Sequence, residues 1–181
     1  MIRTERVRLR AVEPSDVDLL YQWENDPSIW HVSNTLAPYS KFQIEQFVLN
    51  AQQDFFTTGQ LRLMIESYDH DLKGQVAGAV DLFDIDAVNR RAGIGIMIVK
   101  EYRHLGIAGE AIEALIGYAK DPLFLHQLFC NISEDNEQSI RLFERAGFIR
   151  CGTRKEWLIT QNGWKDEHFY QLLLDSFTSR A

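Results

Sequence analysis

The stretch AGIGIMIVKEYRHLGIAGEAIEAL, from Ala92 to Leu115, decides the fold, because it joins an apolar run to a helical pattern through a short segment with two glycines. The run AGIGIMIV is apolar throughout, as expected of a central strand buried on both faces. From Ile107 onward, apolar residues recur on one side of a predicted helix. The stretch therefore predicts a buried strand, a turn around Gly106 and a helix.

The turn between this strand and helix is a candidate phosphate site. A helix N-terminus presents backbone N–H groups without intrahelical partners, and its dipole favours an anion there. Arg103 adds a cation, and the amides from Gly106 to Gly109 can point in one direction. A plain tight turn also explains the glycines, since glycine adopts a positive φ without strain. The phosphate interpretation therefore needs support from the residues on either side.

Three other glycine-rich motifs do not fit this stretch. A P-loop requires Gly-Lys followed by Ser or Thr, which the sequence lacks. A dinucleotide fingerprint requires three glycines directly after a strand, whereas Gly93 and Gly95 lie at the start of the strand. A KH-type RNA clamp also uses two glycines, but a net charge of −7 is unfavourable for binding a phosphate backbone. We therefore expect no nucleic-acid partner.

The composition is that of one ordinary globular domain, with 181 residues of which 45% are hydrophobic and 25% charged. No apolar run reaches the roughly 18 residues needed to cross a bilayer, and the N-terminus lacks the apolar centre of a secretory signal. We expect a cytoplasmic protein without a membrane partner. Cys130 and Cys151 are expected to be buried, reduced thiols. The histidines form no HxxxH pair, so no metal site is predicted.

The remaining patterns predict one strand, two helices, an antiparallel meander, a β–helix–β–helix unit and a closing hairpin. Pro14 opens a short helix that stops before Pro27, and Ser40 with Gln43 has the form of a capping box for the next helix. Asn162-Gly163 is a strong hairpin signal between the last two strands. Strands are expected at residues 6–12, 61–67, 75–85, 92–99, 126–133, 154–160 and 164–174, a turn at 69–74, and further helices at 107–122 and 136–147.

Two segments of the chain carry a family resemblance. The stretch from Ala92 to Leu115 resembles the central motif of GNAT-type N-acyltransferases, an apolar strand followed by R-x-x-G-x-A at the start of a helix. NISEDNEQSIRLFERAGF, from Asn131 to Phe148, is similar to their second motif, a strand, an asparagine and a helix that ends in Gly-Phe. The resemblance covers essentially the whole chain and is strongest to the branch of ribosomal-protein alanine N-acetyltransferases and spermidine N-acetyltransferases.

The resemblance implies both the fold and the co-substrate. The expected fold is a mixed α/β (α+β) GNAT-like single domain over residues 1–181, with a central, mostly antiparallel sheet, a splayed parallel strand pair and flanking helices. Acetyl-CoA is expected between the splayed strands, with its pyrophosphate at the helix N-terminus. Position by position, the resemblance assigns cofactor binding to Met97, Ile98 and Val99 on the strand, to Arg103, His104, Leu105, Gly106, Ile107, Ala108 and Gly109 in the turn, and to Asn136, Ser139 and Phe143 on the second helix.

The implied reaction is attack of an unprotonated primary amine on the thioester carbonyl. The sequence departs from the family at two positions: Phe143 stands where many relatives have a tyrosine acid, and Gly93 where relatives have a glutamate base. Asp81, Asp84 and Glu156 are hypothetical catalytic replacements, although each also fits a solvated carboxylate at a strand edge. The alternative is a non-catalytic acyl-CoA-binding sensor or interaction module.

The expected acceptor is a polyamine, a peptide N-terminus or another amine-bearing small molecule, and the choice stays open because family likeness does not transfer substrate specificity. A homodimer or a higher homo-oligomer is compatible with the resemblance. Aromatic residues in a domain of this size serve as core more often than as pocket walls. The region that resembles the acceptor side contains the aromatic residues Trp23, Trp30, Tyr39 and Phe42 and the acids Glu24 and Asp26.

Overall fold

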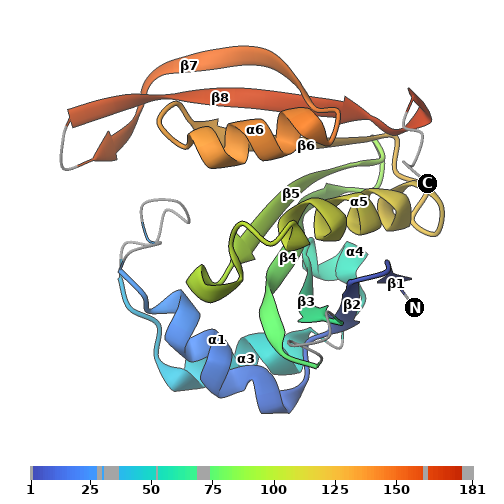
Figure 1. The fold of residues 1–181 in the computed structure, drawn as a ribbon, viewed down its shortest axis with the longest axis vertical. Helices are drawn as coiled ribbons and strands as arrows, with labels where there is room; N and C mark the ends of the chain where they lie inside the picture. Colours follow the sequence, from blue (N-terminus) through green and yellow to red (C-terminus); the bar gives the residue numbers. More distant parts are fainter. Residues whose placement is uncertain are drawn as a thin grey trace.

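The computed structural model describes residues 2–27, 30, 37–51, 53–68, 74–160 and 163–176. The strands in these ranges are β1 (Ile2–Arg3), β2 (Val7–Ala11), β3 (Leu61–Ser67), β4 (Val76–Asp86), β5 (Arg91–Ile98), β6 (Gln127–Ser133), β7 (Ile149–Thr160) and β8 (Gly163–Leu173). They form one sheet in the order β1-β2-β3-β4-β5-β6-β8-β7 (Figure 1). Every neighbouring pair is antiparallel except β5 and β6, which are parallel. The predicted mixed sheet with one parallel pair is confirmed.

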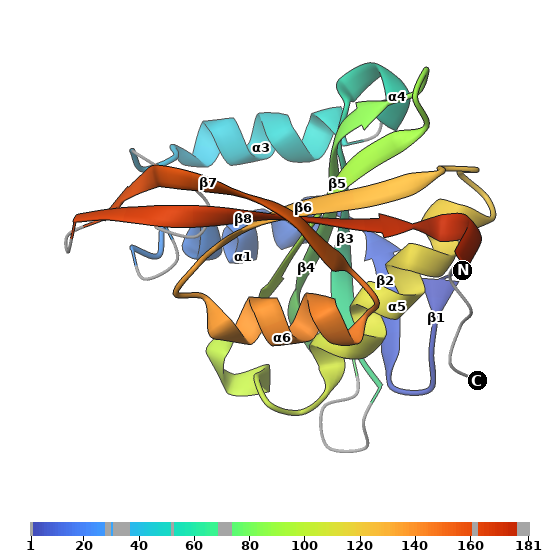
Figure 2. The same cartoon turned by 90° about the horizontal axis from the view of Figure 1, so that it is seen from above.

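Helices cover both faces of this sheet (Figure 2). They are α1 (Val17–Glu24), α3 (Lys41–Asn50), α4 (Phe55–Thr58), α5 (Ile107–Lys120) and α6 (Glu137–Arg145), with short 3-10 turns η1 (Pro14–Asp16), η2 (Lys100–Tyr102) and η3 (Leu174–Ser176). The apolar sides of α5 and α6 join the larger core with Leu82 and Leu128. Helices α1 and α3 cover a smaller core on the opposite face, over Met64 and Ala79.

The helix ends follow the local sequence signals. Ser40 and Gln43 form the predicted capping box of α3: the Ser40 hydroxyl accepts from the Gln43 N–H at 3.2 Å, and the Gln43 side chain accepts from the Ser40 N–H at 2.8 Å. Gly147 follows α6 with a φ of +95°, the conformation that glycine allows after a helix. The helix expected from Pro14 begins as a 3-10 turn and continues as α1, because the Asp16 N–H donates to the Glu13 carbonyl at 2.8 Å and the Val17 N–H donates to the Pro14 carbonyl, each three residues back.

Some expectations from the sequence need correction. Cys130 is buried as predicted, but Cys151 is exposed, because it lies on the edge strand β7. This strand begins at Ile149 rather than residue 154, since pairing with β8 continues to Gln171. The hairpin is confirmed by the pairing of Thr160 with Gly163, although Asn162 lies outside the described residues. Most of the predicted turn at 69–74 also lies outside them.

Candidate active site

The parallel strands β5 and β6 separate partway along their length. Their ladder contains three partner pairs, Arg91 with Gln127, Ala92 with Leu128 and Gly93 with Phe129. Beyond this point β5 continues to Ile98 paired with β4, and β6 continues to Ser133 paired with β8. The strands are drawn apart at this end in Figure 1, with α5 and α6 on either side of the opening. The splayed pair predicted from the resemblance is therefore present.

The edge of β5 that faces the opening can be identified from its hydrogen bonds. The Val99 N–H donates to the Ala77 carbonyl on the β4 side at 2.9 Å, and the Val99 carbonyl accepts from the Tyr102 N–H at 3.0 Å. Because backbone groups alternate in direction along an antiparallel strand, Met97 also faces β4, whereas Ile96 and Ile98 face β6. Among the three predicted strand residues, Ile98 thus faces the opening, together with Ile96, which the sequence interpretation did not name.

The N-terminus of α5 follows the open end of β5. Gly106 is the N-cap residue and has a φ of +81°, and His104 before it has a φ of +65°. Arg103 turns back toward the strand, where its Nε donates to the Ile98 carbonyl at 3.0 Å. The side chain of Ile107 is only 3% exposed and belongs to the core, so only its backbone can meet a ligand. The predicted turn thus presents a helix N-terminus next to the split strands.

Helix α6 contributes residues from the other side of the opening. The side-chain oxygen Oδ1 of Asn136 caps the helix by accepting from the Ser139 N–H at 3.2 Å. The side-chain NH₂ of Asn136 is therefore not needed for the cap. Phe143 is 4% exposed, and its ring meets Phe148 edge-on with centroids 5.2 Å apart. Phe143 therefore packs in the core, and its contact with a bound co-substrate stays a prediction.

An aromatic row lines the sheet face opposite α5 and α6 at the point where the strands separate. Phe83 lies beside Gly93, and its ring is edge-on to Phe129 at 6.1 Å. Phe129 in turn stacks with Phe169 on β8 at 5.8 Å. A glutamate at position 93 would meet the Phe83 ring. The close packing of Phe83 on Gly93 therefore leaves no space for the glutamate base expected from the resemblance.

Asp81 is on the same face of the sheet, opposite Gly95 on β5, and is held in an ion-pair cluster. Arg62 on β3 donates through Nε to Asp81 at 2.7 Å and through Nη1 to Glu24 of α1 at 2.5 Å. Its guanidinium also lies 5.1 Å from the Phe47 ring centroid. Burial lowers the pKa of Arg62, but the charges of Asp81 and Glu24 and their hydrogen bonds outweigh it, so the net shift is upward. Arg62 stays charged, and the three side chains carry a net charge of −1.

The other two acids proposed from the sequence are exposed side chains on β4 and β7. Asp84 and Glu156 are exposed and have φ values of +48° and +50°, at irregular positions of β4 and β7. The Glu156 N–H donates to Asp166 at 3.0 Å. Strands β4 and β7 are four spacings apart in the sheet, which amounts to about 19 Å. The structure therefore does not bring Glu156 together with Asp81 in one site.

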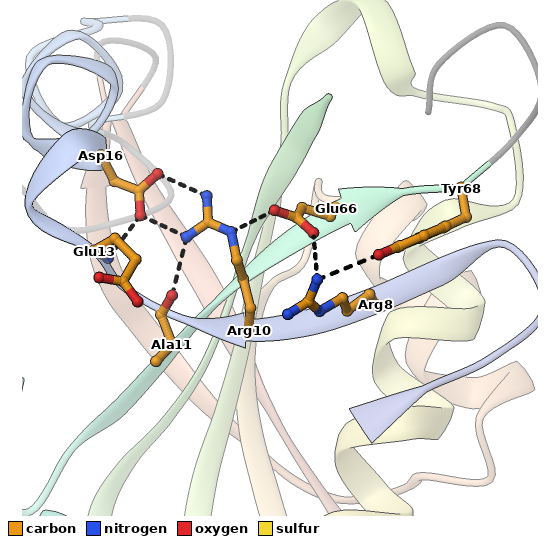
Figure 3. Close-up of polar contacts among 7 residues, drawn as sticks. All are labelled: Arg8, Arg10, Ala11, Glu13, Asp16, Glu66 and Tyr68. Carbon is orange, nitrogen blue, oxygen red and sulfur yellow. Dashed lines mark hydrogen bonds and ion pairs between the residues drawn. The ribbon is translucent and has the colours of Figure 1, made fainter. Parts of the chain in front are cut away.

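Helix α1, which carries Glu24, is fixed to the sheet at its other end by a second polar cluster (Figure 3). Arg10 on β2 donates to both oxygens of Asp16, at 2.6 and 2.8 Å, and to Glu66 at 2.6 Å. Glu66 also lies 3.5 Å from Arg8, which donates to the Tyr68 hydroxyl at 3.3 Å. The sequence interpretation assigned Asp16 only to a helix N-terminus and gave no role to Arg8, Arg10, Glu66 or Arg62, since a lone charge in an alternating strand is usually a solvated surface residue.

The aromatic residues expected on the acceptor side are divided between core and surface. Trp23 packs against the smaller core, and the Trp30 indole donates to the Glu24 carbonyl at 2.9 Å. Tyr39 and Phe42 are 38% and 66% exposed. Of these four aromatic residues, Trp30 is therefore the one with a hydrogen bond to Glu24 of the acid cluster.

Neither a metal site nor a membrane helix is found in the part of the chain that the structure describes. Its histidines, cysteines and acids form no group of three or more that could hold a metal ion. None of its helices is long and apolar enough to span a bilayer.

Comparison with known proteins agrees with this geometry. Residues 6–149 match the family model of the acetyltransferase (GNAT) domain. A spermidine N(1)-acetyltransferase of Escherichia coli (strain K12) is 29% identical over 145 residues, which are 78% of this chain and 72% of that protein. A Bacillus subtilis protein whose name suggests a ribosomal N-acetyltransferase, YdaF, is 35% identical over 100 residues, 55% of each chain.

A solved structure is also similar over nearly the whole chain. It is spermidine N-acetyltransferase from Vibrio cholerae in complex with CoA and spermine, with a TM-score of 0.82 at 23% identity, covering 95% of this chain and 98% of that one. These relatives are acetyltransferases by name, so the alternative of a non-catalytic module gains no support from them.

Proposed function

The chain belongs to the GNAT acetyltransferase family and is an acetyl-CoA-dependent N-acetyltransferase, and from that premise we propose that its acceptor is the primary amine of a small polycation. The acceptor proposal rests on the acids Glu24 and Asp81 around Arg62. The site for acetyl-CoA rests on the end of the β5–β6 ladder at Gly93 and Phe129, with the N-terminus of α5 beyond the open end of β5. This arrangement offers backbone groups to an extended arm and amides to a pyrophosphate.

Each part of the opening has a role in binding acetyl-CoA under this proposal. The backbone N–H groups from Gly106 to Gly109 receive the pyrophosphate, because they lack intrahelical partners. The exposed edge of β5 at Ile96 and Ile98 pairs with the pantetheine arm, and the Asn136 amide donates to it from α6. The thioester then lies near the last strand pair, beside Phe83 and Phe129.

The reaction needs few protein groups for proton transfer. The amine nitrogen forms a bond to the thioester carbonyl carbon and the C–S bond breaks. The amine loses its proton to water, and the thiolate takes a proton from water. A thiol has a pKa of about 8.5, so the thiolate is a stable leaving group without a tyrosine acid. Asp81 accepts two hydrogen bonds from Arg62, and we assign it to attracting a cationic acceptor.

The acid cluster supports a cationic acceptor. Glu24 and Asp81 outnumber Arg62 by one charge, and both side chains lie on the face where the aromatic row meets the opening. An amine with a lysine-like pKa near 10 is mostly protonated at neutral pH and is attracted to such a cluster. The relatives named for spermidine, and the similar structure solved with spermine, favour a polyamine over a peptide N-terminus.

The test is an acetylation assay with a panel of polyamines, aminoglycosides and short peptides. CoA release is followed with a thiol reagent, and the acetylated product by mass spectrometry. The Cys151→Ser variant is used throughout, since the exposed Cys151 thiol would consume the reagent. We expect turnover with polyamines above that with peptides. Tight CoA binding without turnover on any amine would instead support the sensor alternative.

Three further expectations stay predictions: location in the cytoplasm, assembly into a homo-oligomer, and one domain spanning residues 1–181. Sedimentation of the purified protein would decide the second.

A further inference from the structure

Arg6, the residue before β2, lies against the N-terminus of α5. Its Nη1 donates to the Leu105 carbonyl at 3.1 Å, and its Nε donates to Glu110 in the first turn of α5 at 2.6 Å. A Cβ added to Gly106 would lie 2.9 Å from Arg6 Nη2. Position 106 therefore favours glycine for its positive φ, and the absence of a Cβ leaves room for the guanidinium beside it.

The bond to Leu105 fixes the direction of the next N–H group. The Leu105 carbonyl and the Gly106 N–H belong to one planar trans peptide, in which the two groups point in opposite directions. Since the carbonyl is turned toward Arg6, the Gly106 N–H is turned away from it. The same contact keeps a carbonyl oxygen, which repels anions, pointed at a cation.

Arg6 neutralises the negative charge of Glu110 near the N-terminus of α5. A carboxylate in the first turn of α5 is favourable for the free helix, but it repels a pyrophosphate bound at the same N-terminus. The Glu110 carboxylate forms an ion pair with Arg6 and accepts from the Thr4 hydroxyl at 2.6 Å. Burial raises the pKa of Glu110, but the bonds from Thr4 and Arg6 outweigh it and lower the pKa, so Glu110 is ionised at neutral pH.

We propose that Arg6 is a positioning residue for the acetyl-CoA pyrophosphate: it orients the Leu105–Gly106 peptide and neutralises Glu110 at the N-terminus of α5. Its guanidinium is already bound by Leu105 and Glu110, so it acts through them rather than as a direct phosphate ligand. The inference rests on the proposed function, because it assumes that the pyrophosphate binds at this helix.

The experiment compares Arg6→Gln, Glu110→Gln and the double variant. CoA affinity is measured by calorimetry, and kinetics are measured with acetyl-CoA and with S-acetylpantetheine, which lacks the pyrophosphate. Arg91→Gln is the matched control. The Arg91 side chain is 49% exposed and pairs with Asp86, much as the Arg6 side chain is 45% exposed and pairs with Glu110. Arg91 begins β5, at the end of the strand away from the N-terminus of α5.

We expect Arg6→Gln to weaken CoA binding about tenfold, the effect of one charge-assisted contact, with kcat changed less than about twofold. With S-acetylpantetheine, Arg6→Gln and wild type should have equal kcat/KM. The double variant should recover about half of the loss on a logarithmic scale, because the repelling carboxylate is gone while the peptide stays unoriented.

Two results would overturn the inference. One is unchanged CoA affinity in Arg6→Gln. The other is an equal loss with both acyl donors and no recovery in the double variant, which would indicate a general structural role. If wild type itself failed to bind CoA while remaining folded, the proposed function would fall, and that result is distinct from either of these.

Discussion

The ring of Phe83 occupies the space that a side chain on Gly93 would need: an ideal Cβ built on Gly93 would lie 2.3 Å from Phe83 Cε2 and 2.5 Å from Cζ. Both residues are partners across the β4–β5 ladder, and Gly93 is also the last residue of β5 that pairs with β6. A glutamate at position 93, which the family resemblance leads us to expect, therefore does not fit unless the Phe83 ring moves.

We predict that Gly93→Glu alone destabilises the protein by at least about 2 kcal/mol, because it overpacks a filled site. Phe83→Ala combined with Gly93→Glu should recover part of this loss and add a new acidic limb to the pH profile of kcat/KM. Urea unfolding and pH-dependent kinetics are the measurements, with Phe83→Ala as the control. A Gly93→Glu protein as stable as wild type would show that the ring moves freely.

Glu24→Gln should raise the KM for a polyamine about tenfold and leave the KM for acetyl-CoA unchanged. The reason is that Glu24 supplies half of the negative charge around Arg62 and lies on α1, which covers the sheet face opposite α5, the helix proposed to bind the pyrophosphate. Glu45→Gln, an exposed acid on α3, is the control. Steady-state kinetics with each substrate varied in turn decide the matter, and an equal change in both KM values would contradict the role in acceptor binding.

Asp16 should make stability depend on pH in the acid range. Burial opposes its ionisation, but the hydrogen bonds from Arg10 and from the Glu13 N–H, with the charge of Arg10, outweigh burial and lower its pKa. A lowered folded-state pKa adds stability that is fully present above the unfolded pKa of about 3.9 and is lost as pH falls toward the folded value.

Asp16→Asn should therefore cost about 3 kcal/mol at pH 7, since it breaks a pair in which Asp16 is almost fully buried. The difference from wild type should shrink between pH 4 and the acid-unfolding range. Asp18→Asn is the control, because Asp18 is 77% exposed in its pair with Lys41. Urea unfolding at several pH values tests this, and a difference independent of pH would refute it.

The two cysteines should differ in reactivity. Burial raises the pKa of Cys130 to about 12, and its side chain is 2% exposed, whereas Cys151 is exposed. We expect one thiol to react with an aromatic disulfide reagent at pH 8 in the native protein, and a second only after unfolding. Cys151→Ser should abolish the native reaction. Reaction of both thiols at native speed would mean that the core around Cys130 opens.

Much of the local structure could be predicted from the sequence because its causes are a few residues apart. The capping box of Ser40 and Gln43 spans three residues, and Asn136 caps the N–H of Ser139 over the same distance. The strand, glycine turn and helix from Ala92 to Leu115 follow from apolar patterning. The two motifs also predicted the family and the split between the parallel strands, since both depend on the order of these elements.

The partners of the charged side chains could not be predicted in this way. Arg6 meets Glu110 across 104 positions, and Arg62 meets Glu24 across 38. Charge complementarity in a sequence does not select one partner among many, because register and helix placement decide which side chains come within hydrogen-bond distance.

The sequence by itself thus determined the elements, their order and the helix N-terminus that can bind a pyrophosphate, because these depend on local patterning. The tertiary structure decided that Phe83 covers Gly93, that Arg62 joins Glu24 to Asp81, and that Arg6 orients the start of α5. Each of these depends on the register between strands and on how helices pack across the sheet, which bring distant residues into contact.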